Sequence, residues 1–417
     1  MPTTRIDESS WKIGINNKAH PSKMPNGSLR EAVNCFVGNS GMMTKRAGYT
    51  QKSTGVFSAI GPDNCPRCFA VKDDDLVEIK PNGTSYTFTV LRAGVGYMDM
   101  SFCELNGNYY YTSRAVSGVI TSTGIKTFGQ AQVNVQPTLT ATTGTMPAGT
   151  YLVAVTTLDA SGMESGTKEP TSIVLAANKQ IALSNIYVST DPRVTSIAIY
   201  CSTANGEKLF RQAVIANGTT TANITTVNTH TFPLGKIGTF PAPTGGHLMA
   251  YHYGHLYLAV NNFIFYSEPR PSYEQFHPIN NYAFTSKITA ILPCESGLWV
   301  STERDGFFWI NGKTPHQGFN AQGDMQAFKK HSACLLVGSA KLIPAEFIGN
   351  GNPTYGWKAT AKEGQFLLLD GGQFHNVTQD NINMPELEFC AGAIINDSDS
   401  YKYASLMAGH NLPLRTI

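Results

Sequence analysis

Charged residues are scarce in this chain. Only 14% of its 417 residues are Asp, Glu, Lys or Arg, whereas ~25% is usual in globular proteins. The 31 basic and 29 acidic residues leave a formal net charge of +2, and the basic residues form no cluster. Nucleic-acid-binding proteins usually carry a basic stripe or arm, so the sequence argues against tight binding of DNA or RNA.

Long apolar runs and cysteine pairs are also few. No window approaches the ~18 uninterrupted apolar residues of a membrane-spanning helix, so no membrane insertion is expected. The first residues, Met1–Glu8, are polar and do not resemble a secretory signal. The eight cysteines are scattered, and several lie in strand-like apolar runs, where cysteine acts as a small buried hydrophobe. We therefore expect assembly in a cytoplasm that keeps thiols reduced.

Glycine and aromatic residues are plentiful, with 39 glycines, 21 phenylalanines and 18 tyrosines. This mixture favours many short strands joined by tight turns. Turn signals separate alternating apolar segments from about residue 67 onward, at Asp73–Asp75, at Asn82-Gly83 and at Glu104–Asn108. Asn-Gly readily adopts the positive φ angles of a two-residue hairpin turn.

The hairpin pattern returns near residue 245 in units of about 40 residues, the size of a β-propeller blade. Between the two hairpin regions the chain becomes rich in Thr, Ala and Val, and about seven short strands indicate a β-sandwich. We predict an all-β fold, a β-propeller-like array of antiparallel hairpins with an inserted sandwich. The predicted regions are an extended N-terminal assembly arm (1–60), a first propeller segment (61–132), the sandwich (133–240) and a second propeller segment (241–417).

Several local patterns could carry chemistry, but each has a simpler structural interpretation. Cys65 and Cys68 have zinc-knuckle spacing without the second close pair that a structural zinc site needs. His247, His252 and His255 lack a nearby acidic ligand, and Asp73–Asp75 lacks the spacing of a calcium loop. The segment from Gly306 to Thr314 has a strand where a phosphate-binding loop has four residues. We expect no catalytic, cofactor-binding or metal-binding residues, and no enzyme activity.

Three stretches, taken in order, resemble the tail hub or nozzle proteins of short-tailed bacteriophages, also called packaged-DNA stabilisation proteins. The first is Ser28–Cys35 followed by Gly41–Tyr49. The second lies in the sandwich and is similar to a fibronectin-III/Ig-like domain, and it comprises Tyr151–Thr157, Asp159–Ser165 and Ile197–Ser202. The third resembles a pair of propeller blades and comprises Tyr251–Pro269 and Gly297–Gly312. The resemblance implies a ring of six subunits below the portal, with a central channel that retains and then conducts DNA.

The predicted function is therefore that of a structural virion protein. We expect a homo-oligomeric, hexameric ring in the virion tail, assembled in the host cytoplasm. Portal or adaptor proteins would contact one side, and distal tail proteins or fibres the other. DNA would pass through the lumen without tight binding, because a channel must release it. Arg46, Gly48 and Tyr49 are the candidate assembly residues.

A second function from a different class stays open at this point, namely a receptor- or glycan-binding phage tail protein. In that case exposed aromatic side chains, among them Trp299, Trp309 and Trp357, would stack on sugars. A fibrous repeat or trimeric stalk, which such proteins usually carry, is not visible in the sequence.

Overall fold

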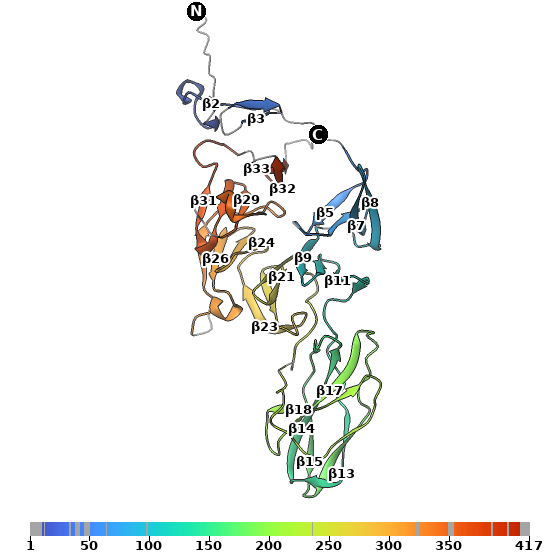
Figure 1. Ribbon diagram of the computed structural model, residues 1–417. Helices are drawn as coiled ribbons and strands as arrows, with labels where there is room; N and C mark the ends of the chain where they lie inside the picture. Colours follow the sequence, from blue (N-terminus) through green and yellow to red (C-terminus); the bar gives the residue numbers. More distant parts are fainter. Residues whose placement is uncertain are drawn as a thin grey trace, which may run out of the picture. The chain divides into compact units, whose positions relative to one another are not determined.

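Figure 1 shows the computed structural model of the chain. It describes residues 11, 13–32, 35–37, 42–45, 51–63, 65–96, 99–235, 237–321, 325–348, 354–384, 387–397 and 400–408. The chain divides into two compact units. One consists of residues 57–79 and 88–284, and the other of residues 1–56, 80–87 and 285–417.

Outside the sandwich, four-stranded sheets dominate the described structure, and in each of these sheets strands that are consecutive in the sequence are neighbours. The three that precede residue 284 are β5–β8, β9–β12 and β20–β23. Their strands are β5 (Phe57–Gly61), β6 (Cys68–Lys72), β7 (Asp75–Asn82), β8 (Ser85–Arg92), β9 (Ser101–Leu105), β10 (Asn108–Thr112), β11 (Ser117–Ile120), β12 (Ile125–Lys126), β20 (Leu248–His252), β21 (His255–Val260), β22 (Phe263–Ser267) and β23 (Phe276–Ala283).

Two further sheets of this kind follow residue 284, namely β24–β27 and β28–β31. Their strands are β24 (Ile288–Pro293), β25 (Gly297–Thr302), β26 (Phe307–Asn311), β27 (Ala327–His331), β28 (Lys341–Ile343), β29 (Gly356–Ala361), β30 (Gly364–Leu368) and β31 (Phe374–Asn376). The prediction of an all-β chain built from antiparallel hairpins is confirmed.

Alternating side chains on the inner strands explain why these sheets stack. On β10, Tyr109 and Tyr111 pack into one apolar core with Phe69 of the preceding sheet. Tyr110, between them, packs into a different core with Leu256 of the following sheet. Successive residues of a strand point to opposite faces, so one run of three tyrosines joins sheet β9–β12 to both of its neighbours.

The same rule holds in the other unit. Trp299 of β25 and Phe366 of β30 share one core, to which strands β24–β26, β29 and β30 contribute. The ring of Phe307 lies 5.6 Å from that of Trp299 and 5.3 Å from that of Phe366, in edge-on pairs, a geometry that aromatic quadrupoles favour.

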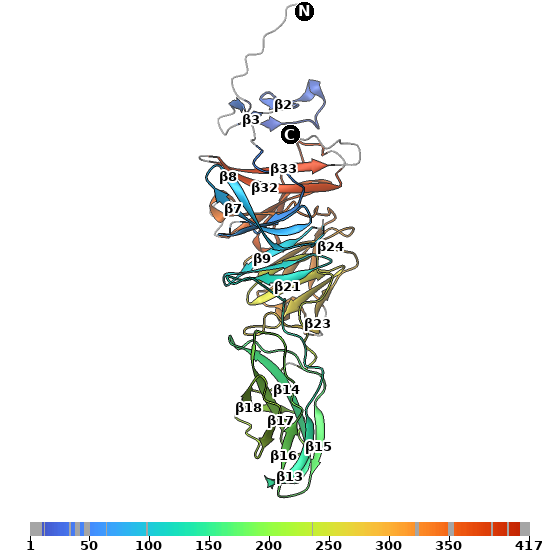
Figure 2. The same cartoon turned by 90° about the vertical axis from the view of Figure 1, so that its right-hand side faces the viewer.

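Seven strands form the sandwich, which is drawn in green in Figure 1 and Figure 2. One sheet has the order β13-β16-β19 and the other β15-β14-β17-β18. The strands are β13 (Thr138–Met146), β14 (Gly149–Asp159), β15 (Thr171–Leu175), β16 (Lys179–Ser184), β17 (Val194–Ser202), β18 (Leu209–Ala216) and β19 (Ala222–Ile224). Both sheets supply one shared core, which includes Val153, Ile181 and Ile199.

The remaining elements are short or two-stranded. They are β1 (Gly14–Ile15), β2 (Ser28–Leu29), β3 (Cys35–Val37), β4 (Met43–Lys45), β32 (Phe389–Asp397), β33 (Ser400–Ala408), the helix α1 (Ala345–Ile348) and the 3-10 turns η1 (Pro21–Lys23), η2 (Pro315–Gly318) and η3 (Asp370–Gly372). Among the described residues, no helix has the length and apolar character that crossing a bilayer requires.

A short stretch of the N-terminal segment packs on the C-terminal region of its own unit. The backbone N–H of Asn17 donates to the carbonyl of Asn381 at 3.0 Å, and the N–H of Asn383 donates to the Asn17 side chain at 2.6 Å. Lys18 donates to the carbonyl of Gln379. Residues around 17 are therefore tied to their own chain.

The predicted hairpin turns are found with one shift. Asp73-Asp74 and Asn106-Gly107 form two-residue turns with positive φ at both positions, as the mirror-image turns of hairpins require. The turn predicted at Asn82-Gly83 lies one residue later in the structure, where Asn82 is the last residue of β7 and Gly83-Thr84 forms the turn. Gly83 still provides the positive φ, 60°.

Candidate functional site

The three candidate assembly residues, Arg46, Gly48 and Tyr49, lie outside the described residues. The strand just before them, β4, is exposed along its whole length, and Met43 has 47% of its surface accessible. The role of this segment in assembly stays a prediction.

The thiols and imidazoles considered as metal ligands belong to Cys65, Cys68, His247, His252 and His255. No group of three or more His, Cys, Asp or Glu side chains could hold a metal ion in the stretches of chain that the structure describes. Cys65 and Cys68 are free thiols, and burial, helped by Asp63, raises the pKa of both. His255 is buried, and its Nδ1 lies 2.6 Å from the carbonyl oxygen of Ser267.

Two of the three tryptophans named for sugar stacking are buried, so the glycan-binding hypothesis is wrong for these two, whereas Trp357 is half-buried. Trp299 is fully buried and Trp309 is 3% exposed. The Trp299 indole donates to the carbonyl of Leu369 at 2.8 Å, and the Trp357 indole donates to that of Pro293 at 2.7 Å. Period-two alternation placed these rings in the core between two sheets, which the sequence pattern alone did not distinguish from an exposed face.

Three segments meet side by side where the chain enters and leaves the sandwich. Val133 forms a parallel bridge to Thr167, and Thr167 forms another to Ile237. The N–H of Val133 donates to Gly166 O at 2.9 Å, and that of Gly238 donates to Thr167 O at 2.9 Å. Any Cβ at Gly166 would collide with the Thr239 carbonyl oxygen, so glycine is required for this close approach. We call these three segments the neck of the sandwich.

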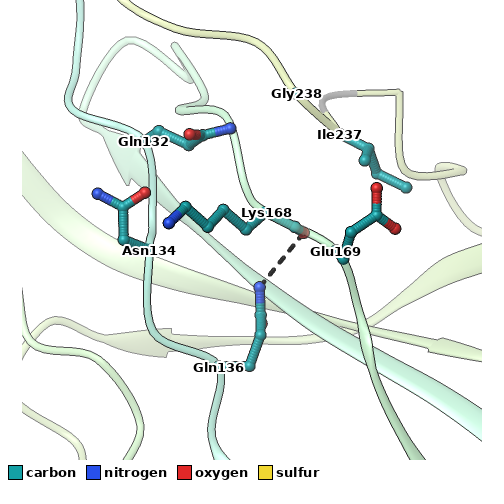
Figure 3. A pocket seen from close by; sticks show the side chains of 7 residues that line it. All are labelled: Gln132, Asn134, Gln136, Lys168, Glu169, Ile237 and Gly238. Atoms are coloured by element: carbon teal, nitrogen blue, oxygen red, sulfur yellow. Dashed lines mark hydrogen bonds between the residues drawn. The ribbon is translucent and has the colours of Figure 1, made fainter.

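A cavity of about 350 Å³ opens at the neck (Figure 3). Its polar lining consists of Gln132, Asn134, Gln136, Lys168 and Glu169. The Gln136 amide bonds to Thr167 and to the Lys168 carbonyl, and its oxygen accepts from Val155 N–H at 3.2 Å. Because Gln136 is held in this way while Asn134, Lys168 and Glu169 are exposed, the cavity offers both donors and acceptors to a polar ligand.

A buried carboxylate joins the sandwich to the sheets of the same unit. Glu274 is 0% exposed. Its Oε1 accepts from the Tyr110 hydroxyl at 2.9 Å and from the Lys126 ammonium at 3.0 Å. Its Oε2 accepts from Gly129 N–H at 3.2 Å and lies 3.5 Å from the Arg193 guanidinium. We call these five residues the Glu274 cluster.

Arg193 is the sandwich's contribution to this cluster. It also donates to the carbonyl of Gly129 at 2.8 Å and to the carboxylate of Asp191 at 2.6 Å. Hydrogen bonding from Arg193 is the main cause that holds the pKa of Asp191 below its usual range. Burial, followed by the charge of Glu274, raises the pKa of the Tyr110 hydroxyl, so the phenol stays a donor. The cluster links the sandwich to the sheets of its own unit, and sequence reasoning did not find it.

The chain matches no family model and no curated protein. Similar solved structures include an extracellular domain assigned to a hybrid two component system of B. thetaiotaomicron, with 11% identity and a TM-score of 0.30, covering 81% of this chain and 36% of that chain. AztD of Citrobacter koseri has 10% identity and a TM-score of 0.29, covering 88% and 93%. YCF48 bound to D1 peptide has 11% identity and a TM-score of 0.25, covering 78% and 81%.

This chain therefore spans about a third of the B. thetaiotaomicron domain. At these identities and TM-scores, the similarities carry no inference about function.

Proposed function

We propose that this chain is a structural subunit of a tailed-bacteriophage virion, of the tail hub or nozzle type. It would be built as a β-propeller-like scaffold with an inserted fibronectin-III-like sandwich, and its copies would form a ring around a DNA channel. The observation that supports this most directly is the series of four-stranded, up-and-down sheets, interrupted after the second by the sandwich.

The physical argument is that such sheets need neighbours on both faces. A strand such as β25, whose six residues are all buried, is stable only if both faces are covered by apolar surface. Radial repetition satisfies every sheet in this way and leaves only short edges. In this proposal the surface serves contacts between copies, which agrees with a charged fraction of 14%, because interface cores are depleted in charge.

The test is the particle that the purified chain forms. We expect negative-stain images to show closed rings, and light scattering to give a mass several times the 45.1 kDa of one chain. Arg46→Glu and Tyr49→Ala should weaken binding to the purified portal or adaptor, whereas Arg114→Glu, at an exposed position between β10 and β11, should not. A chain that stays monomeric at all concentrations and adheres to host cells would contradict the proposal.

Weak binding of DNA belongs to the same proposal. Affinity for duplex DNA falls with salt in proportion to the number of phosphates that a protein neutralises. With a net charge of +2, we expect the assembled ring to bind DNA weakly. Tight binding of a short duplex at ~0.2 M salt, measured by fluorescence anisotropy, would count against a channel that releases its cargo.

Glycan binding remains a second candidate because of the neck cavity. Amide side chains beside one ammonium and one carboxylate (Figure 3) can hydrogen-bond a ligand rich in hydroxyl groups. A glycan array with the intact chain and with the Asn134→Ala variant tests this candidate. Binding that the substitution abolishes would favour it over the purely structural role.

A further inference from the structure

A second cavity, of about 270 Å³, lies in the unit that contains residues 285–417. Apolar side chains from three elements line it. Ile343 and Leu367 come from sheet β28–β31, Phe347 from helix α1, and Ile394 from β32, and the cavity also contacts the ring of Tyr403 on β33. The one charged side chain of its lining is Lys358 of β29.

Strand register explains how a lysine comes to line an apolar cavity. Lys358 pairs with Lys341 on β28 and with Leu367 on β30, and cross-strand partners share a face of the sheet. The neighbouring residue, Trp357, points to the other face and packs against the core that contains Leu368. Lys358 is therefore fixed on the cavity side by the burial of its neighbour.

The ammonium of Lys358 has no counter-ion within the described residues. It takes part in no ion pair or hydrogen bond there, and burial alone lowers its pKa from 10.5 to about 8. Lys341 faces it from β28 with like charge. Tyr403 faces it from β33 with its hydroxyl already engaged by Ser339 O at 2.7 Å and Thr360 at 2.9 Å. On the other packed elements, Glu346 of α1 and His375 of β31 are exposed.

We propose that this cavity binds an aliphatic carboxylate, with the carboxylate on the Lys358 ammonium and the hydrocarbon chain against Ile343, Leu367 and Ile394. Lys358 is half-buried, and a charge withdrawn from water without a partner is unfavourable, so a monoanion would supply a counter-ion. Apolar walls favour the hydrocarbon portion of the ligand.

The size of the cavity and its few hydrogen-bonding groups restrict which ligands fit. At ~30 Å³ for each water-sized volume, the cavity holds about nine such volumes, which suits a chain of about eight carbons. A peptide segment fits less well, because its N–H and C=O groups would meet apolar walls without partners. A phosphate group would need more donors than one ammonium provides.

The probe is octanoate, titrated into the intact chain by calorimetry at pH 7, with octan-1-ol and octylamine as comparisons. We expect octanoate to bind, octan-1-ol to bind at least tenfold more weakly, and octylamine not to bind. Lys358→Met should lower the octanoate affinity at least tenfold. The matched control is Lys341→Met. Lys341 lies opposite Lys358 but does not line the cavity, so this variant should keep the octanoate affinity.

The pH dependence of octanoate binding provides an independent test. Octanoate affinity should fall as the pH rises above about 8, where Lys358 loses its proton, and the Lys358→Met variant should show no such fall. Circular dichroism will show whether that variant is folded. Equal affinity for octanoate and octan-1-ol, unchanged affinity after Lys358→Met, or no octanoate binding at millimolar concentrations would each overturn the proposal.

Discussion

Substituting Glu274 by glutamine should loosen the joint between the sandwich and the sheets of its own unit. In the Glu274 cluster Oε1 accepts from two donors, and Oε2 accepts from Gly129 N–H and lies 3.5 Å from the Arg193 guanidinium. Whichever oxygen becomes the amide NH₂, two donors then face a third donor instead of an acceptor. Glu274 is fully buried, and Arg193 and Lys126 are 15% and 22% exposed, so water replaces the lost acceptor only incompletely.

The magnitude follows from the groups that lose their partner. A hydrogen bond to a charged group contributes ~1.5–3 kcal/mol, and removing one member of a buried ion pair costs ~3–5 kcal/mol. With the two cations partly hydrated, we expect a loss of about 3 kcal/mol in the free energy of unfolding. For a unit of roughly 220 residues, at ~2–4 °C per kcal/mol, the melting temperature should fall by about 6–12 °C.

Scanning calorimetry of the full chain measures this shift, since the two units can melt in separate transitions. The matched control is Glu207→Gln at an exposed position of the sandwich, and its effect should stay within ~0.5 kcal/mol. If Glu274→Gln melts at the same temperature as Glu207→Gln, the Glu274 cluster does not stabilise the joint, and the reasoning fails.

Three further predictions concern other regions of the chain. Gly306→Ala should lower the free energy of unfolding by about 3 kcal/mol or more, because φ is +95° and a Cβ there would collide with the carbonyl oxygen of His331 on the facing strand. Gly83→Ala, which lies in open space at φ +60°, should lower it by only about 1 kcal/mol. Urea titration measures both. Cys201 and Cys294 are 0% exposed, and burial raises the pKa of each to about 12, so iodoacetamide at pH 8 should label them only after unfolding, and rapid labelling of the native chain by mass spectrometry would contradict this. The Lys358 pKa is lower in the folded chain than in the unfolded chain, so the unfolded chain binds more protons between pH 8 and 10.5 and the free energy of unfolding should rise with pH in that window. Lys358→Met should abolish that rise and increase the free energy of unfolding at pH 7 by roughly 3 kcal/mol, at ~1.36 kcal/mol per pH unit. Thermal melts from pH 7 to 10.5 measure this, and an equal change in both chains would refute it.

Local patterns predicted much of the fold. The aromatic run Tyr109–Tyr111 predicted a strand, and the turn signal Glu104–Asn108 predicted the turn before it, because both signals depend on neighbours in the sequence. The shift at Asn82-Gly83 shows where such local signals stop. A glycine can occupy either central position of such a turn, so the register was decided by strand pairing and not by the dipeptide.

The polar sites could not be predicted in the same way. Glu274 follows cis-Pro271 by three residues in a segment that reads as a loop, and its partners come from positions 110, 126, 129 and 193. Lys358 lies in a strand whose alternation places a lysine on the outward face. Its burial results from α1 and the β32–β33 hairpin, which lie ten or more residues away in the sequence, so burial could not be inferred from the strand itself.

The neck has a consequence for how this architecture can change over time. Val133 and Ile237 are two strand positions apart across Thr167, or roughly 10 Å at ~4.8 Å per strand. A linker of about three or four extended residues could span that distance. A short linker could therefore bridge the gap left by the hundred or so residues between Val133 and Ile237, but the exchange would remove Arg193 from the buried Glu274. A replacement module that preserves the joint would have to place a cation at the same position.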